Sequence, residues 1–551
     1  MPEYLSPGVY IEELAGPKPI EGVGTSTGAF VGIAEKGPIN SPRLITNLTQ
    51  FNDTFGGFIP SAFLAYAVQH FFTEGGTRCY VTRVHKLTTA PTINNPKPDV
   101  AKLDLRTAND QVSTIVMTVF ASSEGKWGET VSVQTAPAGF SPTPDPNKFK
   151  LNIFLAGTVE PVESFDQLSM KEFDATGVLP NPDHVERRIN GISKYIVVKD
   201  ASTLTTDIAP PFFPASPNPL LPPKPLANGS DGLPPGTAGA TNLLPADLIG
   251  GVASGTTPAR GLFAFDAVDD INIVAIPDLV LSAFATADVR AAIGAGMTYC
   301  ENRKDCFYVA DTRDGLSPQD ALAFKRGTAP FSGNAFASKY GAIYYPWIFA
   351  TDPITGKAKL VPPSGAVAGS YSASDVRVGV HKAPAGIEDG FLNSAVDIER
   401  VITKGEQDTL NPEGVNVIRK FADAGIVIWG ARTVSSDPEW KYVNVRRLFI
   451  FLEESILKGT QGVVFEPNDP SLWKRIIRDV GAFLRIQWSE GKLVGDKPEK
   501  AFFVKCDAET NPPESVDLGR VITMIGVAPS KPAEFVIFRI RQTRSGGSVT
   551  E

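Results

Sequence analysis

The stretch INIVAI at Ile271–Ile276 is short, apolar and β-branched, which is typical of a buried strand. It is followed by a helical segment at Ala287–Asn302 and by the apolar run CFYVA at Cys306–Ala310. A second helix at Ser317–Arg326 opens with a favourable Ser-Pro cap, and AIYYPWI at Ala342–Ile348 completes the unit. Strands that alternate with helices in this way predict a parallel sheet covered by helices.

The same pattern occurs near the start of the chain. GAFVGIA at Gly28–Ala34 and CYVTRV at Cys79–Val84 have the composition of strands. Between them, Ala62–Glu74 has apolar residues at helical spacing and is followed by two glycines, which favour a helix end. We therefore expect residues 26–88 and 259–385 to form one α/β middle domain.

Residues 89–258 have a different character. Alternating, Thr- and Val-rich sequence at Val112–Val119, Val131–Thr135 and Lys150–Leu155 predicts strands. A proline-rich tract follows at Pro210–Pro235, and such sequence favours extended, exposed chain. We expect an inserted, β-rich outer domain with a long exposed loop.

The last third contains two long amphipathic helices. In Tyr442–Leu457 and Ser471–Glu490 the apolar residues fall on one stripe, and strands are predicted at Ala501–Cys506 and Arg520–Ala528. We expect residues 386–533 to form a further domain. The fold class is therefore α/β and α+β, in several domains.

Both ends of the chain predict single strands on extended leads. Val9, Tyr10 and Ile11 stand among prolines and glycines in residues 1–25, and the alternating run EFVIFRIR opens the C-terminal segment 534–551. An isolated strand of this length cannot bury enough surface to be stable. Each terminal arm must therefore pair with a sheet, in this chain or in another.

The composition excludes several classes of protein. The 551 residues carry a net charge of −8, which argues against a general nucleic-acid or membrane binder, since both need a basic face. No apolar run approaches the roughly 20 residues of a membrane helix, and the N-terminus lacks the pattern of a secretory signal. The four scattered cysteines predict buried, reduced thiols, and we expect the chain to be made and folded in a cytoplasm.

The sequence contains no recognisable catalytic or cofactor motif. The four histidines stand outside any zinc spacing, and the glycines of GVGTSTG at 22–28 precede a strand where a dinucleotide turn needs a helix. Asp266, Asp269 and Asp270 lack the glycine and glutamate of a calcium loop, so they are better interpreted as a turn before the next strand. We predict no catalytic residues, no metal and no cofactor.

One positive cluster falls on the polar face of the second long helix. Lys474, Arg475 and Arg478, with Arg485 further along, lie in the only third of the chain without an acidic excess. A solvated helix face explains such a cluster. A seat for a negatively charged partner is the alternative, and both interpretations stay open at this point.

A series of short segments follows a recognisable order along the chain. They are SPGVYIE at Ser6–Glu12, TGAFVGIAEKGP at Thr27–Pro38, YYPWI at Tyr344–Ile348, VPPSGAVAG at Val361–Gly369, VHKAPAG at Val380–Gly386, LNPEGVNVIR at Leu410–Arg419, IWGAR at Ile428–Arg432, NVRRL at Asn444–Leu448, FEPNDPSLW at Phe465–Trp473 and APSKPAEFV at Ala528–Val536. Together they resemble the contractile tail sheath family of phages, R-type pyocins and extracellular contractile injection systems. The resemblance covers residues 6–83 and 260–541, and the 89–258 insert carries none of it. One departure is His381, where many sheath proteins have a tryptophan before the KAPAG segment.

The resemblance implies an architecture for the assembled particle. In such sheaths the chain ends and the last third form an inner domain against a tube, while middle insertions face outwards. The terminal arms of neighbouring subunits add strands to a third subunit's sheet. In this chain the donated strands would contain Val9, Tyr10 and Ile11 at one end and Phe535, Ile537 and Ile540 at the other.

The resemblance also implies partners. These are further copies in a helical homopolymer, an inner tube protein, and baseplate and terminator or cap proteins, with no direct nucleic acid and no membrane insertion. Lys474, Arg475 and Arg478 become candidates for facing the tube. The leads from Gly16 to Gly28 and from Pro529 to Pro532 are expected to let subunits rotate without breaking the links. The mature particle would be a virion tail or a released injection system.

Two alternative functions stay open. A tube, baseplate or surface-layer subunit could use the same exchange of strands, and an α/β enzyme with an appended β domain could use the sheet of residues 260–350. The sequence does not distinguish a phage from a bacteriocin or from an extracellular injection system.

Overall fold

The computed structural model describes residues 19–90, 97–108, 113–139, 145, 147–173, 178–201, 210–212, 220–236, 242–255 and 257–535. Val9, Tyr10, Ile11, Ile537 and Ile540 lie outside these described residues. The described chain divides into two compact units. Unit 1 comprises residues 19–25, 374–383 and 442–535, and unit 2 comprises residues 26–373 and 384–441.

Unit 2 is built on an eight-stranded sheet of order β2-β3-β1-β13-β14-β15-β19-β20. The central strands are parallel, and β2 and β20 are antiparallel at the two edges. The strands are β1 (Gly28–Gly32), β2 (Arg43–Ile45), β3 (Cys79–Arg83), β13 (Ile273–Ala275), β14 (Phe307–Asp311), β15 (Gly341–Tyr345), β19 (Val415–Phe421) and β20 (Gly425–Ile428). Every residue of β1, β13, β14 and β15 is buried, as expected of parallel strands covered on both faces.

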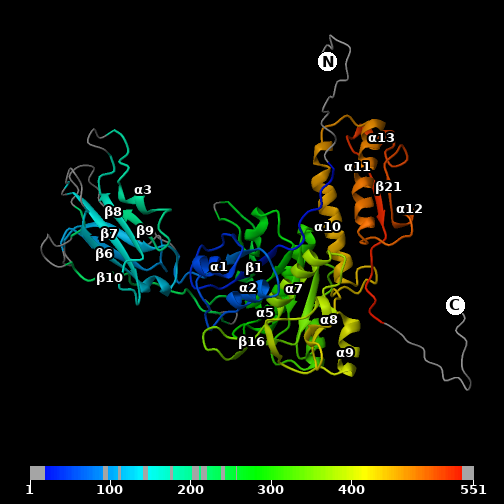
Figure 1. The fold of residues 1–551 in the computed structure, drawn as a ribbon, viewed down its shortest axis with the longest axis horizontal. Helices are drawn as coiled ribbons and strands as arrows, with labels where there is room; N and C mark the ends of the chain where they lie inside the picture. Colours follow the sequence, from blue (N-terminus) through cyan, green and yellow to red (C-terminus); the bar gives the residue numbers. More distant parts are fainter. Residues whose placement is uncertain are drawn as a thin grey trace, which may run out of the picture. The chain divides into compact units, whose positions relative to one another are not determined.

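Helices cover this sheet (Figure 1). They are α1 (Leu48–Phe55), α2 (Leu64–Thr73), α4 (Pro245–Ile249), α5 (Thr286–Arg303), α6 (Pro318–Arg326), α7 (Ser364–Arg377), α8 (Gly386–Asp389) and α9 (Lys404–Leu410), with 3-10 turns η2 (Leu262–Ala267), η3 (Pro277–Val280) and η4 (Asn411–Glu413). Ser317 caps α6 as its sequence predicts, because the Asp320 N–H donates to the Ser317 hydroxyl at 3.1 Å. The predicted mixed α/β fold is confirmed.

Residues 97–236 form two antiparallel sheets over a common apolar core that includes Met117, Val133 and Ile153. One sheet has three strands, β4 (Lys102–Arg106), β5 (Ile115–Ala121) and β9 (Ile196–Asp200). The other has four, β10 (Lys224–Pro225), β6 (Val131–Pro137), β7 (Lys148–Leu155) and β8 (Glu163–Ser169). The turn η1 (Lys126–Thr130) and the helix α3 (Val185–Ile189) complete this part, and β11 (Gly250–Gly251) pairs with β12 (Arg260–Gly261) after it.

The proline-rich tract is not wholly an exposed loop, which corrects the expectation for residues 210–235. Lys224 and Pro225 pair with β6 at the edge of its sheet, and Leu226 is buried in the core. A proline can occupy an edge strand because no neighbour there needs its missing N–H.

Two predicted boundaries also differ from the structure. The run 342–348 contains two strands, since β15 ends at Tyr345 and β16 (Ile348–Thr351) joins a different sheet with β17 (Ala358–Val361) and β18 (Ala395–Ile398). Pro346, which has no backbone N–H, stands at the break. Residues 386–441, which were expected in the C-terminal domain, belong to unit 2 because β19 and β20 complete its sheet.

Unit 1 contains the two long helices predicted from the last third, α10 (Val443–Gly459) and α11 (Pro470–Ser489). They pack on each other and on an antiparallel pair, β21 (Phe502–Lys505) and β22 (Met524–Val527), around a core that includes Leu448, Val480 and Leu484. The short elements are η5 (Gln461–Val463), α12 (Pro498–Ala501) and α13 (Pro513–Asp517). Asp469 caps α11 by accepting the Leu472 N–H at 2.8 Å.

Candidate assembly site

The carboxyl edge of the large sheet, where parallel α/β proteins bind ligands, holds structural carboxylates. Asp278, after β13, accepts backbone N–H groups of Ile33 and Phe63, and Asp311, the last residue of β14, accepts the N–H of Ser364 at 2.8 Å. Burial raises the pKa of each carboxyl to about 7. The hydrogen bonds of these two carboxyls fix the backbone at Ile33, Phe63 and Ser364 beside this edge of the sheet.

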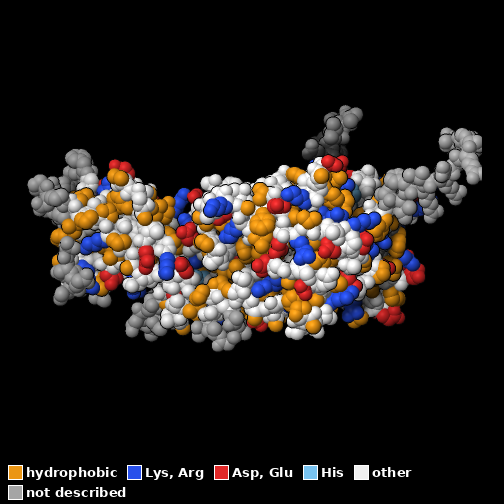
Figure 2. Space-filling view, turned by 90° about the horizontal axis from the view of Figure 1, so that it is seen from below, with side chains coloured by type: hydrophobic (Ala, Val, Ile, Leu, Met, Phe, Trp, Pro, Cys, Tyr) orange, Lys and Arg blue, Asp and Glu red, His pale blue; other side chains and the backbone are white. Residues whose placement is uncertain are grey.

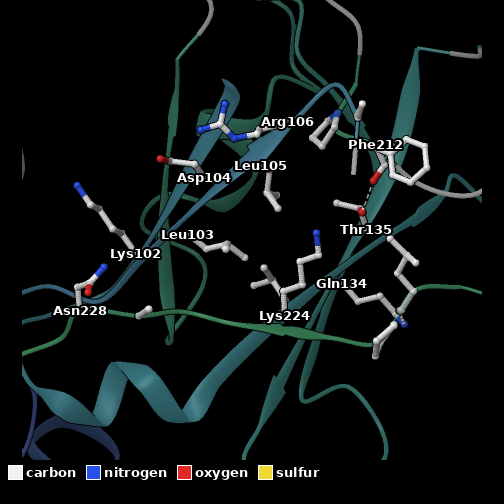
Figure 3. Close-up of a pocket in the computed structure, with 16 residues that line it drawn as sticks. Lys102, Leu103, Asp104, Leu105, Arg106, Gln134, Thr135, Phe212, Lys224 and Asn228 are labelled. Carbon is white, nitrogen blue, oxygen red and sulfur yellow. Dashed lines mark hydrogen bonds between the residues drawn. The ribbon is translucent and has the colours of Figure 1, made fainter. Parts of the chain in front are cut away.

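A cavity of about 550 Å³ lies between the strands β4 and β6. In Figure 3, Leu103 and Leu105 point towards it, while Asp104 and Arg106 point to the other side of β4. Thr135 donates its hydroxyl proton to the carbonyl of Phe212 at 2.7 Å across the opening. The described lining contains no histidine or cysteine.

The described residues give no support to a metal site or a membrane span. They contain no group of His, Cys, Asp and Glu side chains able to hold a metal ion. Asp266 accepts a hydrogen bond from Tyr299, and Asp270 pairs with Arg78 at 3.3 Å. None of the described helices is long and apolar enough to cross a bilayer. Basic and acidic side chains are mixed over the face shown in Figure 2.

The two-stranded sheet of unit 1 has open edges. Phe502 pairs with Val527 and Lys505 with Met524, and within the described ranges neither strand pairs with a third strand. The side chains of Phe503 and Met524 are 52% and 53% exposed. An edge strand presents a row of unpaired backbone N–H and C=O groups, which is a template for a further strand.

The N-terminal lead is fixed along α10, beside which it passes in Figure 1. Ile20 is buried in the core of unit 1, the Val23 N–H donates to the Ser455 hydroxyl at 3.1 Å, and the Thr25 carbonyl accepts from Arg447 at 3.0 Å. A Cβ on Gly22 would lie 2.9 Å from the Phe451 ring, so glycine permits this close approach. The expectation that the lead to Gly28 is a flexible hinge is therefore wrong for residues 20–25.

The C-terminal lead leaves unit 1 at the other end of α10. The side-chain amide of Asn444 donates to the carbonyls of His381 and Ser530, at 2.7 and 3.3 Å. The Tyr442 hydroxyl donates to Glu534 at 3.2 Å, and Phe535 beyond it is exposed. Since a helix rises 1.5 Å per residue, the two leads depart about 25 Å apart, at opposite ends of α10.

A buried ion pair joins α10 to the end of α7. Arg447 donates to both carboxylate oxygens of Asp375, at 2.9 and 2.6 Å, and the side chains are 3% and 2% exposed. Burial raises the pKa of Asp375, although the facing guanidinium opposes the rise. Arg447 thus connects the N-terminal lead at Thr25 to α7. Sequence reasoning missed Asn444 and Arg447, although the polar residues of NVRRL adjoin the apolar stripe of α10.

The three basic candidates lie together on α11. Lys474, Arg475 and Arg478 line one depression of about 520 Å³ at the N-terminal half of that helix. Lys474 and Arg478 are exposed and Arg475 is half-buried. Arg478 pairs with Asp479 at 2.9 Å, and the Arg475 guanidinium lies 3.9 Å from the Glu466 carboxylate. All three side chains therefore lie on one surface of α11.

Two family models match consecutive parts of the chain. The model of the phage tail sheath protein central domain matches residues 257–434, and that of the phage tail sheath C-terminal domain matches residues 435–543. The chain belongs to the phage tail sheath family. This is a family of structural sheath proteins, not of enzymes.

Individual tail sheath proteins are similar to part of the chain. The tail sheath protein of Vibrio phage KVP40 is 22% identical over 310 residues, which cover 53% of this chain and 45% of the relative. The tail sheath protein of Enterobacteria phage T4 is 22% identical over 231 residues, which cover 41% of this chain and 34% of the relative. The chain thus spans less than half the length of these two relatives.

Solved sheath structures share the fold over nearly the whole chain. The sheath of an extracellular contractile injection system (PVC) in the contracted state has a TM-score of 0.55 at 19% identity and covers 99% of both chains. The helical sheath of the anti-feeding prophage in the contracted state has a TM-score of 0.54 at 22% identity, covering 98% of this chain and 99% of that one.

Proposed function

We propose that this chain is the subunit of a contractile sheath, which polymerises helically around an inner tube and contracts to drive the tube through a target cell envelope. Membership of the sheath family supports the proposal. The observation that carries it is the geometry of unit 1, in which two leads depart from opposite ends of α10 and a two-stranded sheet keeps its edges open.

Subunits are linked by exchanged strands. Val9, Tyr10 and Ile11 of one copy add to one edge of the β21–β22 pair in a neighbour, and the strand containing Phe535, Ile537 and Ile540 of another copy adds to the other edge. Such β-augmentation satisfies backbone groups on both strands. Each hydrogen bond contributes only about 1 kcal/mol net, but several links per subunit keep a released arm close to its acceptor.

Contraction is proposed to draw its free energy from the lattice. Subunits pass from an extended, strained lattice to a shorter and wider one that buries more surface, so no nucleotide site is required. Residues 20–25 are held on α10, so they do not act as a hinge between subunits. The bending that accompanies rotation of one subunit against the next therefore occurs closer to the donated strand.

The parts of the chain have distinct proposed positions. Unit 1 forms the inner domain, and Lys474, Arg475 and Arg478 seat the inner tube protein. The rest of unit 2, residues 26–88, 259–373 and 384–441, forms the middle domain, and the β-rich residues 89–258 face outwards. Baseplate and terminator or cap proteins bind the ends of the polymer. The subunit is made in a bacterial cytoplasm and is carried in the mature particle.

Electron microscopy of the purified, full-length protein tests the proposed function. We expect wide helical cylinders, with or without the inner tube protein. Thin tubes or flat arrays would instead favour a tube or surface-layer subunit.

A further inference from the structure

The turn that precedes α11 places an aromatic residue in a backbone conformation suited to glycine. Val464 has φ −67° and ψ 133°, and Phe465 has φ +70°. The Glu466 N–H donates to the Val463 carbonyl at 3.2 Å, which closes the turn. These values are those of a type II turn, whose third position requires a positive φ and normally holds glycine or asparagine.

The Phe465 side chain itself makes no packing contact in the subunit that offsets this strain. Its side chain is fully exposed, and Val464 beside it is exposed as well. A strained backbone persists only where other contacts fix it or where function uses it. An exposed phenylalanine at a position that favours glycine therefore indicates a contact made outside the subunit.

Arg475 holds this turn in place. Its guanidinium donates to the carbonyl of Gly462 at 3.4 Å and lies 3.9 Å from the Glu466 carboxylate, so it contacts both sides of Phe465. The ring is thereby presented on a fixed turn, and a side chain that is already positioned loses less entropy on binding.

The surroundings of the turn define the partner's chemistry. Lys474 makes no ion pair with any described residue, and Arg478, which pairs with Asp479, is largely exposed. Glu466 and Asp469 are the acidic residues of the same depression, the first facing Arg475 and the second capping α11. With Asp479 included, the three basic side chains are balanced in number by three acidic ones, and Lys474 is the basic residue left to bind a partner.

We propose that Phe465 is the apolar anchor of the tube-facing surface, and that it inserts into an apolar recess on the inner tube protein. This inference rests on the proposed function, because it uses the assignment of α11 to the tube. Aromatic anchors ringed by polar contacts commonly dominate binding at protein interfaces. Lys474 and Arg478 supply the surrounding charge.

The variant Phe465→Gly separates binding from folding, because the two effects have opposite signs. Glycine removes the strain, so the thermal unfolding midpoint of the subunit is expected to stay the same or to rise. Co-sedimentation with the inner tube protein of the same particle is expected to weaken about tenfold or more. Val159→Gly, which removes an exposed apolar side chain from the β-rich part, is the matched control and should bind the tube normally.

Three results would overturn the proposal. Wild-type affinity of Phe465→Gly for the tube would show that the ring is not an anchor. Loss of cylinders by Phe465→Gly in the absence of tube would assign the ring to a contact between copies of this chain. Failure of the wild-type protein itself to bind the tube would refute the proposed function, and this proposal with it.

Discussion

The buried pair of Arg447 and Asp375 gives a prediction with a magnitude and a pH dependence. Arg447→Met keeps the length of the side chain but removes the charge and its donors. The change deletes two hydrogen bonds to Asp375, of 2.9 and 2.6 Å, and one to the Thr25 carbonyl, of 3.0 Å. It leaves a carboxylate that is 2% exposed without its counter-charge.

The loss of stability follows from that isolated charge. Removing one partner of a buried ion pair costs about 3–5 kcal/mol, and the lost bond to Thr25 adds about 1 kcal/mol. Protonation of Asp375 relieves part of this cost, and burial already raises the pKa of that carboxyl above its ordinary value. Without Arg447 the native pKa rises further. The native variant then binds a proton that the unfolded chain releases near pH 4, so its stability falls as pH increases, by at most about 1.4 kcal/mol per pH unit.

Urea denaturation, followed by the tryptophan fluorescence to which Trp473 and Trp488 of unit 1 contribute, measures the effect. The stability difference between wild type and Arg447→Met should be larger at about pH 8 than at about pH 5.5. Adding Asp375→Asn to the variant should recover part of the loss at the higher pH, because no buried charge remains. An equal loss at both pH values, or no recovery in the double variant, would refute the reasoning.

Two further predictions concern the tube-facing surface and the large sheet. The double variant Lys474→Glu and Arg478→Glu should weaken co-sedimentation with the tube and reverse its salt dependence. Arg475 is left intact because it holds the turn at Gly462. Unchanged binding at all salt concentrations would count against the assignment of this surface to the tube. Burial raises the pKa of Asp278 from 3.8 to about 7, so this group makes the native protein less stable as pH rises through that interval, and Asp278→Asn should reduce the slope of stability against pH. An identical slope in the variant would contradict this account of Asp278.

The local elements of the fold could be predicted because they depend on short patterns. The apolar runs that became β13, β14 and β15 and the stripes of α10 and α11 are visible in the sequence. The division into units was not predictable in the same way, because β19 joins the sheet next to β15, across a long separation in sequence. Neither strand has a local sequence pattern that identifies the strand with which it pairs.

The candidate site was predictable only in part, for the same reason. Charge pattern alone placed Lys474, Arg475 and Arg478 on one surface. The contacts of Asn444 and Arg447 bring together segments near residues 25, 375, 381 and 530, and no pattern in one helix reveals them. The positive φ of Phe465 could not be predicted from the sequence either, because phenylalanine rarely adopts a positive φ.

Strand exchange through the terminal arms is tested most directly by removing the N-terminal arm. Because Ile20 is buried in the core of unit 1, a deletion of residues 1–18 is cleaner than one of residues 1–20. Electron microscopy of the truncated protein should show no helical cylinders, while its unfolding midpoint matches that of the full-length chain. Cylinders of normal length and width from a correctly folded, truncated chain would contradict the central claim.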